Sequence, residues 1–321
     1  GALAVENALK TAFDWKARKL GRNVEDSADD LVILHLKDAF HGRSGYTLSI
    51  TNTDPIKTAL FPKFKWPRFH NPTIIFDLDG NVSNDIESEE SKSIEDIENA
   101  FETFKDRIAA IIIEPMQGEG GDNHFRTNFF KILRNYADQN EALLIYDEVQ
   151  TGFWGSGKPW LWQHHGVAPD IAAFGKKTQV CGIYASDRID EVKDNVFSLS
   201  SRINSTWGGN LVDMVRSKRF IDIIRSENLA DNILNQGQNF ISGLRNIAAS
   251  HNEITNVRGI GSLIAFTLPD GTIRDTMINN LLKNNILALK SGPTSIRFRL
   301  PLIISEDEVS TALERIEASI D

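Results

Sequence analysis

The chain is poor in cysteine and has no long apolar run, and each absence excludes a class of protein. Cys181 is the only cysteine among 321 residues, so an internal disulfide framework is excluded. No stretch approaches the roughly 18 consecutive apolar residues that span a membrane. The first residues also lack the basic and apolar segments of a secretory signal. We therefore expect a soluble, cytoplasmic protein that does not act at a membrane.

Positive charge is scarce as well. Lys and Arg number 35 against 44 Asp and Glu, which gives a net charge of −9 and a pI near 5.4. This acidity opposes binding to polyanions, so we expect no nucleic-acid partner. The hydrophobic fraction of 41% is that of an ordinary globular protein with a large packed core. The length predicts about two domains.

The chain opens at Gly1, without Met, directly on a helical pattern. Residues 2–20 place apolar side chains on one helix face, which predicts an amphipathic helix. Domains usually begin with a few loosely held residues. We therefore expect the sequence to be N-terminally incomplete and to begin inside a longer protein.

Short apolar runs alternate with helical patterns through the first two thirds of the chain. Continuous apolar strands between helices are typical of a parallel sheet that helices cover on both faces. We therefore predict an α/β fold with a mostly parallel sheet. The predicted strands are 31–36, 108–115, 141–149 and 169–176, and the predicted helices between them are 93–106 and 126–139.

The last third has a different order of elements. A long helical pattern follows residues 206–210 and runs to about residue 225, and it predicts an interdomain helix. We place a domain boundary there, with a large domain over 1–222 and a small α+β domain over 223–321. The small domain is predicted to contain strands at 258–268 and 295–304 and helices at 229–248, 272–284 and 306–319.

Three predicted strands of the large domain end in polar residues. Glu114, Asp147 and Lys176 each stand at or just past the end of a buried strand. Because ligands bind beyond the carboxyl ends of parallel strands, we expect these side chains to share one crevice. A carboxylate and a lysine placed in this way suit pyridoxal phosphate, whose aldehyde binds a lysine amine and whose ring nitrogen needs a carboxylate. On spacing alone an alternative stays open, in which Asp147 and Glu148 cap a helix and Lys176 is a solvated turn residue.

A family resemblance decides between these interpretations. The sequence is similar to the class III pyridoxal phosphate aminotransferases over its whole length, which implies a fold type I architecture. The motifs that carry the similarity are AFHGR (39–43), EPMQGEGG (114–121), DEVQTG (147–152), PDIAAFGKK (169–177) and TWGGN (206–210). Within the family, GKKTQVCG (175–182) and SRINSTWGGN (201–210) most resemble the L-lysine 6-aminotransferases.

The resemblance implies a role for each matching residue around the cofactor. Lys176 matches the lysine that forms the Schiff base and then acts as the general base, and Asp147 matches the partner of the pyridine nitrogen. Gln150 matches the partner of the ring hydroxyl. Phe40 matches the aromatic residue stacked on the ring, and Val149 packs against the opposite face. Lys177, the next residue after Lys176, has no such role.

Other matches concern the phosphate group and a second subunit. Gly1 and Ala2 resemble the end of the loop that holds the phosphate at a helix N-terminus. Thr206 matches a residue that reaches the phosphate of the partner subunit. The resemblance therefore implies a homodimer.

The substrate residues are implied in the same way. Arg43 matches an anchor for the α-carboxylate of L-lysine, and Arg297 matches the arginine that binds the α-carboxylate of 2-oxoglutarate. Glu119 matches a glutamate that pairs with Arg297 and swings aside for the oxoacid. The expected reaction moves the ε-amino group of L-lysine to 2-oxoglutarate and gives 2-aminoadipate 6-semialdehyde and L-glutamate. Two alternatives stay open: another ω-aminotransferase, using ornithine or 4-aminobutyrate, and a non-catalytic chain of the same fold.

The remaining patterns indicate no further chemistry. His164 and His165 are adjacent and have no acidic partner at ligand spacing, so we expect a solvated pair and no metal site. The acidic stretch 77–98 is predicted to form the segment before a helix and the solvated face of that helix. The basic and aromatic stretch 62–70 is interrupted by proline, which predicts a loop near a dimer interface.

Overall fold

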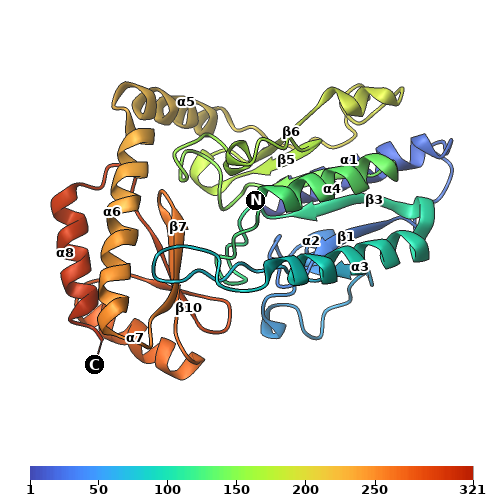
Figure 1. Cartoon of the computed structure of the whole chain (residues 1–321). Coiled ribbons are helices and arrows are strands. Elements are labelled where there is room, and N and C mark those ends of the chain that lie inside the picture. Colours follow the sequence, from blue (N-terminus) through green and yellow to red (C-terminus); the bar gives the residue numbers. More distant parts are fainter. Residues whose placement is uncertain (321) are drawn as a thin grey trace.

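Six strands form the larger of two sheets in a computed structural model that describes residues 1–320 (Figure 1). Their order across the sheet is β2-β1-β3-β4-β5-β6. The pairs from β2 to β5 are parallel, and β6 is antiparallel to β5. The strands are β1 (Val32–Leu36), β2 (Arg68–Phe69), β3 (Ile108–Ile113), β4 (Leu143–Asp147), β5 (Ile171–Phe174) and β6 (Gly182–Ala185).

Side chains of the central strands alternate between two apolar cores. Ile111 and Ile113 of β3 pack in a core that includes residues of α3 (Ile86–Phe104) and α4 (Thr127–Gln139). Ala110 and Ile112 face the opposite core, which is closed by α1 (Ala2–Lys19). Because both faces are covered, β3 is apolar at every position. The predicted α/β fold with a mostly parallel, helix-covered sheet is confirmed.

Helix α3 starts at Ile86, earlier than residue 93, where the apolar pattern alone placed it. Asp85 caps it by accepting a hydrogen bond from the backbone N–H of Ser88 at 3.1 Å. The acidic residues before the apolar pattern therefore form the first turn of the helix, where negative charge is favourable. The stretch is not purely solvated either, because Glu90 is buried and pairs with Arg126 at 2.6 Å.

The C-terminal part forms a separate antiparallel sheet of order β7-β8-β10-β9, as the small α+β domain predicts. Helices α6 and α8 lie side by side and α6 packs on this sheet (Figure 1). Its elements are α6 (Leu229–Ser250), β7 (Thr255–Ile260), β8 (Leu263–Thr267), α7 (Gly271–Lys283), β9 (Leu289–Ser291), β10 (Ser295–Arg299) and α8 (Glu306–Glu317). The helix α5 (Leu211–Ser226) precedes it, so the boundary placed between residues 222 and 223 falls inside α5 and stays a prediction.

One predicted strand is a hairpin. The apolar run 258–268 is divided into β7 and β8 by a turn in which Gly261 has a φ of 57°. A side chain on Gly261 would lie 2.5 Å from the backbone oxygen of Gly155, so both the turn and the close approach require glycine. The turn also packs against the large domain, because the N–H of Ser262 donates to the backbone oxygen of Gly155 at 2.7 Å.

Several shorter segments differ from the predictions in detail. β2 lies inside the stretch 62–70, for which the prolines predict a loop. His164 and His165 are not a solvated pair: Nε2 of His164 lies 3.0 Å from the carbonyl oxygen of Ser156, and the His165 ring packs on Phe130 at 4.2 Å. The other short helices are α2 (Gly45–Ile50), Pro55–Lys57, Lys105–Arg107, Leu161–His164, Lys176–Thr178 and Asp187–Glu191.

Two further properties bear on function. Among residues 1–320, no helix combines the length and apolar character needed to cross a bilayer. Within the same residues, no group of three or more His, Cys, Asp and Glu side chains is arranged to hold a metal ion.

Candidate active site

A cavity lies where the carboxyl ends of β1, β3, β4 and β5 meet and where β10 of the small domain approaches them. This is the position at which parallel sheets bind ligands, because several loops converge there. Every site residue expected from the sequence lines the cavity except Thr206, which is exposed and outside it. The lining residues that matter below are Gly1, Ala2, Phe40, His41, Arg43, Glu114, Glu119, Asp147, Val149, Gln150, Lys176 and Arg297.

Asp147 ends β4 and is only 4% exposed. Its Oδ1 accepts a hydrogen bond from the N–H of Val149 at 3.0 Å. Its Oδ2 lies 2.8 Å from Nδ1 of His41, which must donate the proton when the carboxyl is ionised. Two contacts therefore fix the carboxylate in one orientation. His41 stands in the AFHGR motif next to Phe40, but nothing in the sequence marked it as a site residue.

A second buried carboxyl group, that of Glu114, also lines the cavity. It accepts hydrogen bonds from the N–H groups of Phe40 and Gly118, both at 3.0 Å. Burial raises its pKa to about 7, and the negative charge of Asp147 acts in the same direction. Glu114 thus ties the chain that leaves β1 to the chain that leaves β3. It holds the backbone of Phe40 at the cavity.

Lys176 follows β5 in a left-handed conformation, with a φ of 53°. Non-glycine residues adopt this conformation at a cost, and such residues concentrate at functional sites. Its Nζ donates a hydrogen bond to Oε1 of Gln150 at 2.6 Å. Burial lowers the pKa of the Lys176 amine, while the charges of Asp147 and Glu114 oppose the shift. A larger share of this amine is therefore neutral and nucleophilic than in an ordinary lysine.

The adjacent Lys177 points elsewhere. It does not line the cavity, and its Nζ donates to the backbone oxygen of Gln150. Burial lowers the pKa of Lys177 to about 7, with the cations Arg299 and Lys176 adding to the shift. The structure thus separates two lysines that are neighbours in sequence.

This buried amine predicts a pH dependence of stability. Between pH 7 and the ordinary lysine pKa of 10.5, the unfolded chain binds a proton at Lys177 that the folded chain does not. The free energy of unfolding should therefore rise with pH across that window, by on the order of 2–4 kcal/mol. Lys177→Met should remove this rise in urea unfolding measured at pH 7 and 9.5. The exposed control Lys131→Met should keep the wild-type slope, and an unchanged slope in Lys177→Met would contradict the prediction.

Three charged groups lie at the other end of the cavity: Lys57, Glu119 and Arg297. Their pairing differs from the one that the sequence predicts. The predicted ion pair between Glu119 and Arg297 is not present within residues 1–320, because Glu119 is paired with Lys57 instead. Arg297 is largely buried, and its Nη1 lies 3.9 Å from Oδ1 of Asp122, beyond hydrogen-bonding distance. Burial lowers the pKa of Arg297. The contact of Lys57 had no signal in the sequence, since PIKTA matches no motif.

The cavity residues fit pyridoxal phosphate, the cofactor that the sequence motifs imply. Helix α1 presents its N-terminus at Gly1 and Ala2 without a side-chain cap, so its first N–H groups are available to a phosphate. Asp147 offers a buried carboxylate of the kind that keeps a pyridine nitrogen protonated, and Lys176 offers an amine for the aldehyde. The apolar side chains of Phe40 and Val149 line the same space. Gly42, at φ 123°, is required beside this wall, because a Cβ there would lie 2.6 Å from that of Ala2.

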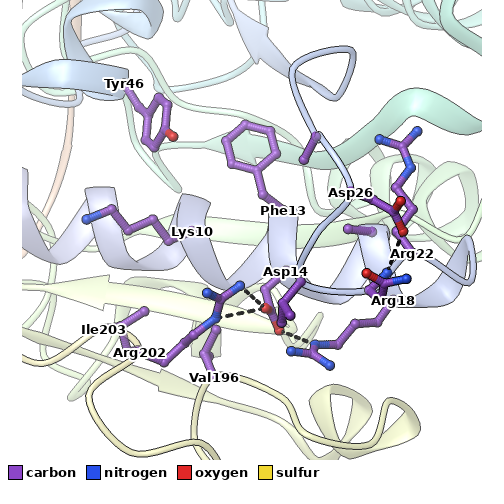
Figure 2. Close-up of a pocket in the computed structure, with 14 residues that line it drawn as sticks. Lys10, Phe13, Asp14, Arg18, Arg22, Asp26, Tyr46, Val196, Arg202 and Ile203 are labelled. Atoms are coloured by element: carbon purple, nitrogen blue, oxygen red, sulfur yellow. Dashed lines mark hydrogen bonds and ion pairs between the residues drawn. The ribbon is translucent and has the colours of Figure 1, made fainter.

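A second cavity lies along α1, beside Phe13 and Tyr46 (Figure 2). Asp14, in its lining, pairs with Arg18 at 2.9 Å and with Arg202 at 2.7 Å. Figure 2 shows both contacts meeting at the Asp14 carboxylate. Paired groups of this kind stabilise structure and leave no activated nucleophile or base, so we assign no chemistry to this cavity.

Comparison with known proteins agrees with the site. The family model described as "Aminotransferase class-III" matches residues 1–320. An L-lysine-epsilon aminotransferase of Mycobacterium tuberculosis is 47% identical over 321 residues, which cover 100% of this chain and 71% of that protein. The structure of a lysine aminotransferase from M. tuberculosis has a TM-score of 0.93 at 45% identity, covering 100% of this chain and 73% of the other. A mitochondrial 4-aminobutyrate aminotransferase of Rattus norvegicus is 30% identical over 326 residues, with 95% of this chain and 64% of that protein covered.

Proposed function

Since the chain belongs to the class-III aminotransferase family, whose cofactor is pyridoxal phosphate, we propose that it is an L-lysine 6-aminotransferase. In the proposed reaction, the ε-amino group of L-lysine passes to 2-oxoglutarate, and the products are 2-aminoadipate 6-semialdehyde and L-glutamate. This step removes the distal nitrogen of lysine and would begin lysine catabolism. The 47% identity to L-lysine-epsilon aminotransferases over the whole chain supports the choice of amino donor.

One observation carries the proposal: a buried carboxylate and an amine of lowered pKa face one cavity from neighbouring strands. Asp147 ends β4 and Lys176 follows β5, and these two strands pair directly. When bound, pyridoxal phosphate supplies an aldehyde that reacts with amines and a ring that accepts electrons from the adjacent carbon. The two side chains are the protein groups that this chemistry requires.

The remaining steps belong to the side chains of the chain itself. Asp147 holds a negative charge beside the ring nitrogen, and His41 keeps the carboxylate in place through its 2.8 Å contact. With the cofactor bound, Nζ of Lys176 would be the base that takes a proton from the ε-carbon of lysine and the acid that gives it back. Burial lowers the pKa of this amine, which favours the neutral form that can accept a proton.

Two arginines reach the cavity from different elements and suit two carboxylates. Arg43 is exposed on the segment between β1 and α2, and Arg297 is largely buried on β10. We assign Arg43 to the α-carboxylate of lysine, which lies far from the reacting ε-carbon. We assign Arg297 to the α-carboxylate of 2-oxoglutarate, which lies next to the reacting carbon. A guanidinium binds a carboxylate through two parallel hydrogen bonds, so each arginine also orients its ligand.

We further propose that the enzyme is a cytoplasmic homodimer. An exposed apolar surface at the start of α5 supports the dimer: Leu211 is 78%, Val212 66% and Val215 70% exposed. Exposed apolar clusters of this kind commonly mark protein–protein contacts. Thr206 lies directly before this surface and is itself exposed, which suits a residue that acts in the site of a second subunit.

The function is tested by visible absorption spectra of the chain purified with pyridoxal phosphate. We expect L-lysine to bleach the visible band of the bound cofactor, and 2-oxoglutarate to restore it. Ornithine and 4-aminobutyrate should bleach it far more slowly, by about 10²-fold, because a site built for one donor leaves polar groups unpaired with another. Bleaching by 4-aminobutyrate or ornithine but not by lysine would replace the proposed donor. A band that no amine changes would contradict the proposed activity.

A further inference from the structure

We propose that Lys57 is a specificity-determining residue that holds Glu119 away from Arg297 and so keeps Arg297 open to the carboxylate of the oxoacid. The proposal deepens the function given above and rests on it. It assigns a role to a residue that no motif singles out. Its basis is the arrangement of three charged side chains at one end of the cavity.

Lys57 makes two contacts at the edge of the cavity. Lys57 ends the short helix Pro55–Lys57, which Asp54 caps by accepting a hydrogen bond from Ile56 N at 3.0 Å. Its Nζ forms an ion pair with Oε1 of Glu119, and it also lies 5.6 Å from the centre of the Phe40 ring. The side chains of Lys57 and Glu119 are 28% and 23% exposed. Two contacts therefore place the ammonium over the cavity edge, partly shielded from water.

Arg297 has unused hydrogen-bond donors on the same side of the cavity as Glu119. Gly118 lies against Arg297, since a Cβ on Gly118 would be 3.7 Å from Nη1 of Arg297. The Nε and Nη1 groups of Arg297 are buried and make no hydrogen bond within residues 1–320. A buried guanidinium with unused donors strongly favours a nearby carboxylate. Glu119 is the residue after Gly118, and it lines the same cavity as Arg297.

Asp122 is another carboxylate near Arg297, and it is already paired. Asp122 is 1% exposed, and Arg299 binds both of its oxygens, at 2.6 and 2.8 Å. Ser291 Oγ also lies 3.3 Å from Oδ1. Asp122 is therefore fully engaged and stays 3.9 Å from Arg297. Glu114 also acts on Arg297, but its carboxylate already accepts hydrogen bonds from the N–H groups of Phe40 and Gly118. Glu119 is left as the carboxylate that competes with an incoming oxoacid, and Lys57 decides how strongly it competes.

The test compares Lys57→Met with the wild-type holoenzyme. The KM for 2-oxoglutarate, divided by the KM for lysine, should rise about three- to tenfold, as expected for a partly exposed charge pair. The Kd of glutarate, a dicarboxylate without the reacting carbonyl, should rise by the same factor in calorimetry. Lys57→Arg should restore both values. The control Lys290→Met removes an exposed positive charge that also acts on Lys57 and should leave both values unchanged.

A double variant separates the proposed role from a general effect of charge. In a Glu119→Gln background, Lys57→Met should have no effect on the KM ratio or on the Kd of glutarate, because the competing carboxylate is gone. A ratio that stays at the wild-type value in Lys57→Met overturns the inference. So does a rise that persists with Glu119→Gln, or a rise confined to the KM of lysine. If the wild type does not react with lysine, the proposed function fails, and glutarate binding still decides the role of Lys57.

Discussion

Replacing Lys176 with alanine should abolish turnover, with a fall in kcat on the order of 10⁴-fold or more. The variant loses both the amine that binds the cofactor aldehyde and the base that moves the proton. Nζ of Lys176 lies inside the cavity and bonds to Gln150, so no other described lysine is placed to replace it there. Stopped-flow measurement of the lysine half-reaction gives the rate, and the visible absorption band of the bound cofactor gives an independent readout.

The matched control for this experiment is the neighbouring lysine. Lys177 is buried outside the cavity and binds a backbone oxygen, so Lys177→Met should keep its rate within about tenfold of the wild type. Wild-type turnover in Lys176→Ala would refute the assignment. A complete loss in Lys177→Met, with activity kept in Lys176→Ala, would exchange the two roles.

Replacing Asp147 with asparagine should lower kcat by about 10²–10³-fold, the usual cost of removing one fixed electrostatic group at a reacting centre. The amide keeps the shape of the side chain and its bond from Val149, but it carries no charge to hold a proton on the ring nitrogen. The electron demand of the ring therefore falls. The KM for lysine should change much less than kcat, because Arg43 and not Asp147 is assigned to the substrate carboxylate.

Glu148→Gln is the control for this variant. Glu148 is a buried carboxyl group next in sequence, but it accepts a hydrogen bond from Trp162 N at 2.9 Å and lies outside the cavity. Its removal should leave kcat within about fivefold of the wild type. Equal losses in the two variants would mean that any buried carboxylate near β4 suffices, which would contradict a specific role for Asp147.

The residues assigned to the cofactor were predictable because they lie in short contiguous motifs at strand ends. Asp147, Val149 and Gln150 follow one strand, and Lys176 follows the next. Parallel strands bring such positions to one edge of the sheet whatever the details of packing. The cavity accordingly brings together all but one of the expected residues, and Thr206 lies outside it.

The contacts that orient those residues were not predictable. His41 meets Asp147 across 106 positions of sequence, and Arg299 meets Asp122 across 177. Lys57 ends a short helix that matches no motif, and the motif that contains Glu119 gives no sign of their contact. Periodicity describes one element at a time, so it cannot show which loop of one element reaches the loop of another.

The amino-acid sequence by itself determined the α/β class and the order of the elements, through apolar period and strand length. The residues of the cavity were implied by the resemblance of short motifs to a family. The tertiary structure decided the hairpin at Gly261 and the partner of Glu119. The reason is physical. Each of these depends on a free-energy difference between competing contacts, and the competitors become neighbours only when the chain has folded.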